Sequence, residues 1–441
     1  MINKRLSVTS LVLAPLLIIA ANTAYATTVY PTGVYPTDLN NVQNAVNAGG
    51  TVLLKATNTS GVATSFNFNI WNSFSYDSIP ANSDVQIGTV PVSITGETIG
   101  ANKTTVLGGC VPFYDGNSAV KVSINGIKFV NPQGAAIAFF KSGGVTITNN
   151  EIANPLKYQD ENNLIESSGI YVSGVNNTAA TGPVVISGNY IHGLDGTYEF
   201  GIGLFDVESA STVTANTIVI GDATDSGNGS TEAEAIGILN CTGATIASGN
   251  TITIDGGVGK YGIASHGPNS GAVTMTANQV SVASGATCYE ALGVNGSTGK
   301  TTIVGNLLSV NNYGTNAIEL NGSEYIGTLS GAIVSANVIS LPNSYSSAIE
   351  VNGAVTSSSI SLNLITGLAS YGISSQSDGN TNNNGQLVDL ATSNTYLSNL
   401  FIGFSVYSDD LFLDVNTSHN TVLGAFSSIL NNGTSNTIIK L

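Results

Sequence analysis

Acidic side chains concentrate in one part of this 441-residue chain. The 102 residues between Lys157 and Lys260 contain no lysine or arginine, and they carry 12 of the 27 aspartates and glutamates. Clustered carboxylates offer the oxygen ligands that Ca²⁺ prefers, and two carboxyl groups at a fixed spacing can cleave a glycosidic bond. The same acids could instead only keep an uncharged surface in solution. The sequence leaves these three interpretations open.

Two long segments of this region, residues 154–168 and 221–234, contain the possible metal ligands. Each segment precedes a predicted strand of the same kind, so we expect both loops to emerge along one edge of the molecule. The candidate calcium ligands are Asp160, Glu161, Glu166, Asp222, Asp225 and Glu232.

A catalytic carboxylate pair is the alternative chemistry for the same region. Retaining glycosidases hold their carboxyl groups about 5–5.5 Å apart and inverting enzymes hold them further apart. The strand near Gly201 is expected to end at Phe205, which leaves Asp206 and Glu208 in a turn. The candidate catalytic residues are Glu199, Asp206, Glu208, Glu234 and His266.

Short segments of the form Gly/Ala-apolar-x-apolar recur nine times between Ala136 and Gly372. Period-2 alternation predicts that they are strands with one outward column of side chains. That column is Phe140, Ser173, Phe205, Leu239, His266, Asn295, Asn321, Asn352 and Gln376. The residues expected to bind a ligand beside it are Tyr171, Tyr198, Tyr261, His266, Tyr289, Glu290, Glu319 and Glu350. Aromatic rings, amides and carboxylates suit sugar recognition, although such residues could simply decorate strand ends.

A second pattern, apolar-x-apolar-x-x-Asn-x-apolar, runs through most of the chain. Its asparagines are Asn125, Asn150, Asn189, Asn216, Asn250, Asn278, Asn306, Asn337, Asn363 and Asn420, with Asn394 and Asn436 as doubtful members. A leucine-rich repeat shares this spacing, but it also needs an apolar residue eight positions before each Asn, where Ser142, Thr181 and Glu208 stand here. We therefore predict an all-β, right-handed, single-stranded parallel β-helix with three short strands per coil. Asparagine is expected at the tight turns because it tolerates left-handed backbone geometry, and its stacked side chains should form a ladder.

On this repeat, the chain resembles the parallel β-helix repeat proteins of the pectin-lyase-like superfamily over roughly residues 30–440. The resemblance implies a filled apolar core with function on the outer faces and loops. Pectate lyases of that superfamily commonly use an Arg or Lys base, and its galacturonases carry Gly-His-Gly and Arg-Ile-Lys segments that are absent here. The segment from Tyr261 to His266 is similar to the Tyr-Gly-x-Asp-Pro-His segment of mannuronan epimerases, but Ala264 stands where the acid is expected.

The N-terminal residues predict export and a capped first coil. Residues 1–26 resemble a signal peptide, with Lys4 and Arg5 before an apolar run and Ala24-Tyr25-Ala26 as the cleavage site. We expect residues 27–441 to form one β-helix domain without a membrane span, with a cap and first strand over 27–55 and regular coils over about 111–441. A short amphipathic helix is expected at the cap, with Thr37 as its N-cap and Leu39, Val42 and Val46 on its apolar face.

Charge and cysteine content restrict the partners. Removal of the signal leaves 9 cations against 27 acids, a net charge of −18, and no arginine. Nucleic-acid binding is therefore not expected, since it rests on Lys and Arg contacts to phosphate. Cys110, Cys241 and Cys288 are expected to be small buried apolar residues.

From the sequence we expect a secreted or periplasmic protein that binds extracellular or cell-surface carbohydrate, or has a structural role at a surface, with calcium as the one possible cofactor. The alternative is a carbohydrate-active lyase, hydrolase or epimerase with its site on the acidic loops. The oligomeric state is left open.

Overall fold

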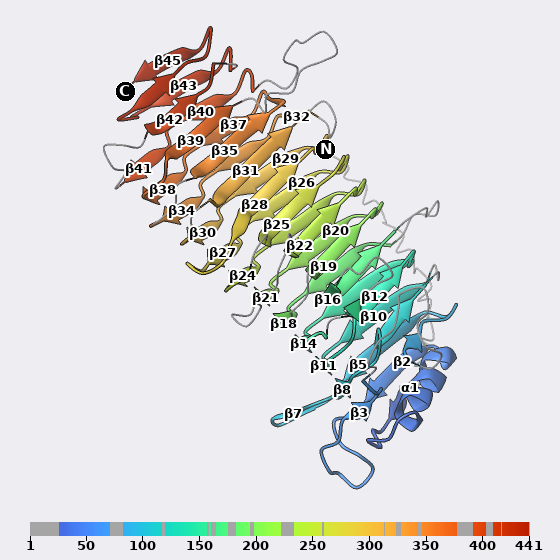
Figure 1. The fold of residues 1–441 in the computed structure, drawn as a ribbon. Coiled ribbons are helices and arrows are strands. Elements are labelled where there is room, and N and C mark those ends of the chain that lie inside the picture. Colours follow the sequence, from blue (N-terminus) through green and yellow to red (C-terminus); the bar gives the residue numbers. More distant parts are fainter. Residues whose placement is uncertain are drawn as a thin grey trace, which may run out of the picture.

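The computed structural model describes residues 26–70, 83–116, 120–156, 158–159, 165–174, 182–194, 198–221, 233–257, 260–312, 314–322, 328–342, 346–376, 391–402, 409–415 and 417–440, without the side chains of 158–159, 165–166 and 198–199. The predicted signal peptide lies outside the described residues up to position 25. Short strands stack as successive coils from α1 at the N-terminal end to β45 at the other (Figure 1). The chain is a right-handed parallel β-helix, as the repeat predicts.

Three long parallel sheets form the walls of the β-helix. The first sheet contains β1 (Thr27–Val29), β2 (Gly50–Leu54), β5 (Val92–Gly96), β10 (Lys121–Asn125), β13 (Gly144–Thr148), β17 (Val184–Ser187), β20 (Ser211–Thr214), β23 (Thr245–Ser248), β26 (Val273–Thr276), β29 (Thr301–Val304), β33 (Ile333–Ser335), β37 (Ser359–Ser361), β40 (Thr395–Leu397), β43 (Thr421–Gly424) and β45 (Thr437–Lys440). The second sheet contains β3 (Phe66–Asn67), β8 (Thr105–Leu107), β11 (Lys128–Val130), β14 (Glu151–Ala153), β18 (Tyr190–Leu194), β21 (Thr217–Ile220), β24 (Thr251–Ile254), β27 (Gln279–Val282), β30 (Leu307–Val310), β34 (Val338–Leu341), β38 (Leu364–Gly367) and β41 (Leu400–Ile402).

The third sheet carries the predicted outward column. Its strands are β4 (Val85–Gln86), β9 (Phe113–Asp115), β12 (Ala135–Phe140), β16 (Ile165–Ser173), β19 (Tyr198–Phe205), β22 (Ala233–Leu239), β25 (Lys260–His266), β28 (Cys288–Asn295), β31 (Asn316–Gly322), β35 (Ser347–Gly353), β39 (Tyr371–Gln376), β42 (Asp409–Leu413) and β44 (Ile429–Asn431), with β15 (Tyr158–Gln159) antiparallel to β16. Two small pairs, β6 (Thr98–Ile99) with β7 (Asn102–Lys103) and β32 (Leu329–Ser330) with β36 (Val355–Thr356), lie outside the three sheets. Parallel pairing begins with β1 and β2 and continues to β5, so strands already stack before residue 111, where the sequence analysis expected the regular coils to begin.

The interior is one continuous apolar cluster that runs through the coils. Alternate strand residues such as Ile202, Ile236 and Ile263 point inward and are fully buried. Each buried aliphatic side chain stabilises the fold by roughly 1.5–3 kcal/mol relative to an exposed one. Because inward positions are filled, only outward side chains and turns remain for chemistry. Cys110, Cys241 and Cys288 are buried, as the sequence predicts, and all three are free thiols.

Stacked asparagines close the turn between the first and second sheets. Asn150, Asn189, Asn216, Asn250, Asn278, Asn306, Asn337, Asn363 and Asn399 are buried, and each of the first eight donates its backbone N–H and its side-chain Nδ2 to Oδ1 of the next. The predicted ladder is therefore confirmed. The left-handed conformation, however, belongs to the residue before each ladder position, for example Asn149, Ala215 and Ala277. The ladder asparagine is selected by its hydrogen bonds rather than by its φ angle.

Some asparagines were assigned to the ladder wrongly. Asn125 pairs with Thr148, and Ile127 occupies the ladder position, where its N–H donates to Asn150. A second ladder at a different turn runs from Ser358 through Asn394 and Asn420 to Asn436. The pattern misplaced these residues because apolar-x-apolar spacing recurs at neighbouring registers in the same coil.

The helix α1 (Thr37–Ala48) covers the N-terminal end of the stack. Leu39, Val42 and Val46 are buried, as the amphipathic pattern predicts. The predicted N-cap is wrong, because the helix begins at Thr37 and Pro36 precedes it without a side-chain cap. The carboxylate of Asp38 instead accepts backbone N–H groups of the adjoining segments, which ties the helix to the first coil. In the part of the chain that the structure describes, no helix is long and apolar enough to cross a membrane.

Candidate functional site

The pairing register of the third sheet places its outward residues in straight columns. The predicted column from Phe140 to Gln376 is paired from Phe140 to His266 and from Asn295 to Gln376, and the pairing of Ser265 with Val294 aligns the two parts. A second column contains Phe200, Glu234, Tyr261, Glu290 and Asn316. A third column lies between these two, and the side chains in its central part are small. Its residues are Tyr171, Gly203, Gly237, Ala264, Gly293, Glu319, Glu350 and Ser374.

Glycines in the middle column make room for two carboxylates. The side chain of Glu234 lies over Gly237, and the side chain of Glu290 lies over Gly293. A Cβ atom at either glycine would collide with a carboxylate oxygen. The two acids are therefore 2% and 5% exposed although they belong to the outward face of the sheet. This arrangement holds both carboxylates flat against the sheet, two coils apart.

Glu234 contacts a histidine from the next coil. Nδ1 of His266 lies 3.3 Å from Oε1 of Glu234. The ring of Tyr261 packs edge-on against His266 with centroids 5.1 Å apart, and exposed Tyr289 lies 5.3 Å from Tyr261. Burial lowers the pKa of His266 to about 4, so its imidazole is neutral at pH 7. A neutral imidazole beside a carboxylate can orient that carboxylate and exchange a proton with it.

The surroundings of Glu290 favour the protonated form of its carboxyl group. Burial, followed by the negative charge of Glu319, raises the pKa of Glu290 well above its ordinary value. Nδ2 of Asn295 donates to its Oε1 at 3.3 Å. Its Oε2 is buried and accepts no hydrogen bond from the residues that the structure describes, while the carboxyl group of Glu319 lies within hydrogen-bonding reach of the Glu290 carboxyl group. A buried carboxyl oxygen without a partner is the kind of exception that a functional site explains.

Two further carboxylates continue the row toward the C-terminal coils. Glu319 and Glu350 pair directly on adjacent strands. Nδ2 of Asn316 donates to both, and Nε2 of Gln376 donates to Glu350. Burial and the charge of Glu319 raise the pKa of Glu350. The row from Glu234 to Glu350 thus combines carboxylates with amide donors over five consecutive coils.

Aromatic side chains border this row on both sides. On the N-terminal side, Tyr171 stacks on Phe205 at 4.6 Å, and Phe200 packs edge-on against Phe205 at 5.0 Å. On the C-terminal side, Tyr371 stacks on Phe412 at 4.7 Å. Such rings can stack on the apolar faces of sugars.

The structure brings together only part of the residue set predicted from sequence. Glu234, His266, Tyr261, Tyr289 and Glu290 form one cluster, and Glu319 and Glu350 extend it. Asp206 and Glu208 lie in the turn after Phe205, as expected, and Asp206 acts electrostatically on Cys241 there rather than on the row. Glu166, Tyr198 and Glu199 lie in β16 and β19, but their side chains are outside the described residues.

The calcium prediction falls mostly on positions that the structure does not describe: Asp160, Glu161, Asp222, Asp225 and Glu232, together with the side chain of Glu166. Within the described ranges, no three His, Cys, Asp or Glu side chains are arranged to hold a metal ion. The sequence analysis missed Asn316 and Phe412 as site residues, and it noted Tyr371 only as one of the tyrosines at strand starts. Asn316 and Tyr371 open the strands that follow Glu290 and Glu350, so extending the outward columns to strand ends would have found them.

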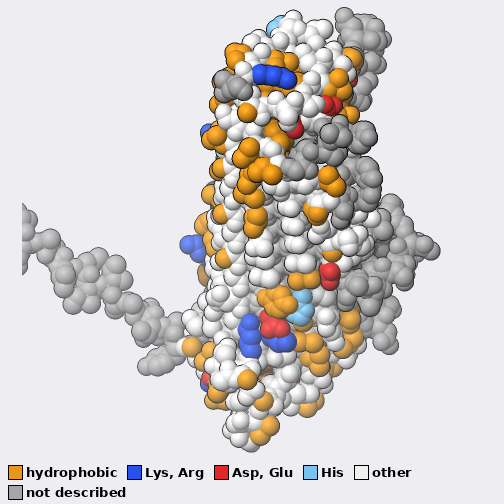
Figure 2. Space-filling model, turned by 90° about the vertical axis from the view of Figure 1, so that its left-hand side faces the viewer, with side chains coloured by type: hydrophobic (Ala, Val, Ile, Leu, Met, Phe, Trp, Pro, Cys, Tyr) orange, Lys and Arg blue, Asp and Glu red, His pale blue; other side chains and the backbone are white. Residues whose placement is uncertain are grey.

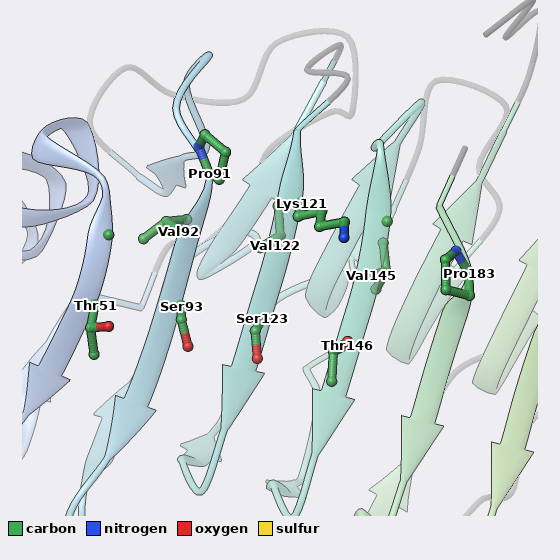
Figure 3. A pocket seen from close by; sticks show the side chains of 12 residues that line it. Thr51, Pro91, Val92, Ser93, Lys121, Val122, Ser123, Val145, Thr146 and Pro183 are labelled. Carbon is green, nitrogen blue, oxygen red and sulfur yellow. The ribbon is translucent and has the colours of Figure 1, made fainter. Parts of the chain in front are cut away.

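Two other polar features lie on the first and second sheets of the described part of the chain. On the second sheet, Nζ of Lys128 lies 2.6 Å from Glu151, and Nε2 of His192 lies 3.7 Å from the same carboxylate. Figure 2 shows basic, acidic and histidine side chains gathered at one place on a surface that is otherwise largely uncharged. A hollow of about 420 Å³ on the first sheet is lined by Thr51, Ser93, Ser123 and Thr146 in a row, with Lys121 beside them (Figure 3). Hydroxyls and one ammonium group provide no acid–base pair there.

Neutral, buried His266 should make stability depend on pH in a defined window. The ordinary histidine pKa is near 6.5 and the folded value is about 4. As pH falls from 6.5 to 4, the unfolded chain binds a proton at His266 that the folded chain does not bind. The free energy of unfolding therefore falls by on the order of 3 kcal/mol. Glu290 and Glu350 act in the opposite direction, because their raised pKa values contribute stability that is lost as pH rises.

We therefore expect wild type to lose stability on acidification relative to His266→Gln, measured by chemical unfolding at each pH. Exposed His419→Gln is the control; parallel curves for all three proteins would contradict the assignment.

Comparison with known proteins adds two solved structures. No family model and no curated protein matches the chain. The A-module of mannuronan C-5 epimerase AlgE6 from Azotobacter vinelandii is 13% identical, with 89% of this chain and 94% of that chain covered and a TM-score of 0.34. A mannuronic-acid-specific polysaccharide family 6 lyase from human gut microbiota is 10% identical, with 90% and 86% covered and a TM-score of 0.33. The chain's own three stacked parallel sheets define it as a parallel β-helix protein.

Proposed function

We propose that this chain is an exported, polysaccharide-active enzyme that hydrolyses a glycosidic bond on the outer face of the third sheet. Glu290 is the general acid, and Glu234, oriented by His266, is the general base. One observation carries the proposal: two buried carboxylates lie over glycines on alternate coils, and the pKa of one of them is raised. Pairs of titratable groups in different environments are typical of acid–base catalysis.

The spacing favours inversion of configuration. Strands of neighbouring coils are ~4.8 Å apart, so residues two coils apart are separated by roughly 9–10 Å. Inverting glycosidases hold their carboxyl groups about 6.5–9.5 Å apart to admit a water molecule. Glu290 would donate its proton to the glycosidic oxygen as the C–O bond breaks. Glu234 would accept a proton from the water whose oxygen bonds to the anomeric carbon, so each turnover consumes one water.

The charges on this face favour a neutral glycan. Carboxylates dominate its charged groups from Glu234 to Glu350, and the mature chain carries a net charge of −18. A polyuronate would be repelled by such a surface. Rings at both ends of the row and amides within it match a linear, uncharged polysaccharide.

A polysaccharide panel tests this function. We expect the purified protein to release new reducing ends from at least one neutral polysaccharide, and the product should first appear with the inverted anomeric configuration by NMR. Unsaturated products from a uronate polymer would instead indicate a lyase, and would overturn the assigned roles.

A non-catalytic carbohydrate-binding protein is the second candidate. The polar row continues well beyond the proposed pair, to Glu319, Glu350 and Gln376, which is more surface than one cleavage site requires. Retention of the protein on a polysaccharide that it never cleaves would favour this candidate.

A further inference from the structure

A hollow at the C-terminal end of the carboxylate row is not used by the proposed acid–base pair. It has a volume of about 290 Å³ and is built by β31, β35, β39 and the residues just before them. Its lining is Asn316, Ser346, Ser347, Glu350, Ser370, Tyr371, Ser374 and Gln376. Every one of these side chains carries a hydrogen-bonding group, so the hollow is suited to a polar ligand.

The walls of this hollow differ in chemistry. Tyr371 forms an aromatic wall, and its ring is held by Phe412 at 4.7 Å with 18° between the ring planes. Glu350 also lines the hollow and accepts hydrogen bonds from the side-chain amides of Asn316 and Gln376. Ser347 and Ser374 are lining residues that are almost fully buried. An aromatic ring together with a fixed carboxylate and amides is complementary to a pyranose ring, which has an apolar face and a rim of hydroxyl groups.

Nearby polar atoms support a ligand at this end of the row. Oδ1 of Asn352, from the same coil as Glu350 and paired with Gln376, is buried and has no hydrogen-bond partner among the described residues. Burial and the charge of Glu319 raise the pKa of Glu350, which favours the protonated form that can donate as well as accept a hydrogen bond. A sugar hydroxyl can satisfy either role.

We propose that this hollow is a binding subsite for one pyranose unit of a linear, neutral glycan that runs along the helix axis. The proposal rests on the proposed function for the polymer, but it concerns recognition rather than cleavage. The hollow spans the coils one to three positions beyond Glu290, and its residues Glu350 and Tyr371 lie two and three coils away, roughly 10–14 Å along the stack. One sugar of an extended chain spans about one coil, so a substrate must continue two or three units past the scissile bond to reach the hollow. The affinity for oligosaccharides should therefore rise sharply at the length that first reaches the hollow.

Calorimetric titration with defined oligosaccharides tests this subsite. The probes are β-1,4-linked glucose, mannose and N-acetylglucosamine oligomers of two to eight units. We expect wild type to bind the longest members of one series at least about tenfold more tightly than the shortest. Tyr371→Ala should remove that gain, and Gln376→Ala should reduce it. Exposed Tyr190→Ala, on the second sheet, is the matched control and should keep the full gain.

The outcomes separate this subsite from the proposed catalysis. Binding with the expected length dependence but without cleavage would contradict the hydrolase and support the subsite. Cleavage with the same length dependence in wild type, Tyr371→Ala and Gln376→Ala would contradict the subsite and leave the hydrolase standing. Failure of all three series to bind wild type would overturn the subsite as assigned. Tyr371→Phe, which retains the ring, should bind like wild type and shows whether a loss in Tyr371→Ala comes from the missing ring.

Discussion

Replacing Glu290 with glutamine should reduce the rate of glycosidic cleavage by about 10²–10⁴-fold, the range for loss of a general acid or base. Glutamine keeps the size of the side chain and a hydrogen bond with Asn295, but it cannot transfer a proton to the leaving oxygen. Glu234→Gln should have an effect of similar size because it removes the base. The measurement is kcat on the polysaccharide identified in the panel, with thermal midpoints to confirm folding.

Matched variants separate catalysis from general damage. Gly293→Ala should lower activity in the same way, because its Cβ displaces the Glu290 carboxylate while all ionisable groups remain. Glu151→Gln removes a carboxylate from the second sheet, where it pairs with Lys128, and should leave kcat within about twofold of wild type. An active Glu290→Gln protein would show that this carboxyl group is not the acid. Selective loss of substrate affinity at normal kcat would indicate a binding role.

Most of the fold was predictable because its signals are local and repeated. Side chains alternate between inward and outward along each strand, and this places Ile202, Ile236 and Ile263 inside the stack. The result does not depend on which coil precedes each strand. The same alternation correctly predicts the outward column that contains His266 and Gln376. Register was harder to predict, since a shift of two residues preserves alternation. That ambiguity explains why Asn125 was assigned to the ladder in place of Ile127.

Contacts within the site were predictable only in part. Column membership follows from spacing, but the direction in which a long side chain leans depends on its rotamer and on space beside it. Glu234 and Glu290 fold over glycines three residues later, but Glu-x-x-Gly also occurs within strands at residues 319–322 and 350–353, so the motif alone does not predict this arrangement. The contact of Glu234 with His266 joins residues 32 positions apart on neighbouring coils. Glu234 thereby places an acid beside His266. In the similar segment of mannuronan epimerases the acid stands at the position that Ala264 occupies here.

The number of coils between groups decides which interactions are possible in this solenoid. Glu319 and Glu350 occupy adjacent coils, and the charge of Glu319 helps to raise the pKa of Glu350, whereas Glu234 and Glu290 have the coil of Tyr261 between them. The intervening coil provides the separation that a water molecule and a sugar require in the proposed reaction. This difference explains why clustering of acids in the sequence alone did not identify the pair.

Replacing Asn250 with alanine should destabilise the protein by at least about 3 kcal/mol, because it leaves several buried polar groups unsatisfied. Oδ1 of Asn250 accepts the backbone N–H and Nδ2 of Asn216, each at 3.0 Å. Its Nδ2 donates to the carbonyl of Val213 and to Oδ1 of Asn278, each at 2.9 Å. No water can replace these bonds without opening the coil, since Asn250 is fully buried. The midpoint of chemical denaturation, followed by circular dichroism, measures the loss.

Asn125→Ala is the matched control for this ladder residue. Asn125 is half-buried and accepts from Thr148 and Asn149 at the edge of the first sheet, so its loss should cost less than about 1 kcal/mol. Each coil of a solenoid contacts only its neighbours. The Asn250 change should therefore weaken the stack at β23 and β24 and let hydrogen exchange begin there while the N-terminal coils remain protected. Equal midpoints for the two variants would mean that the asparagine ladder does not hold the coils together.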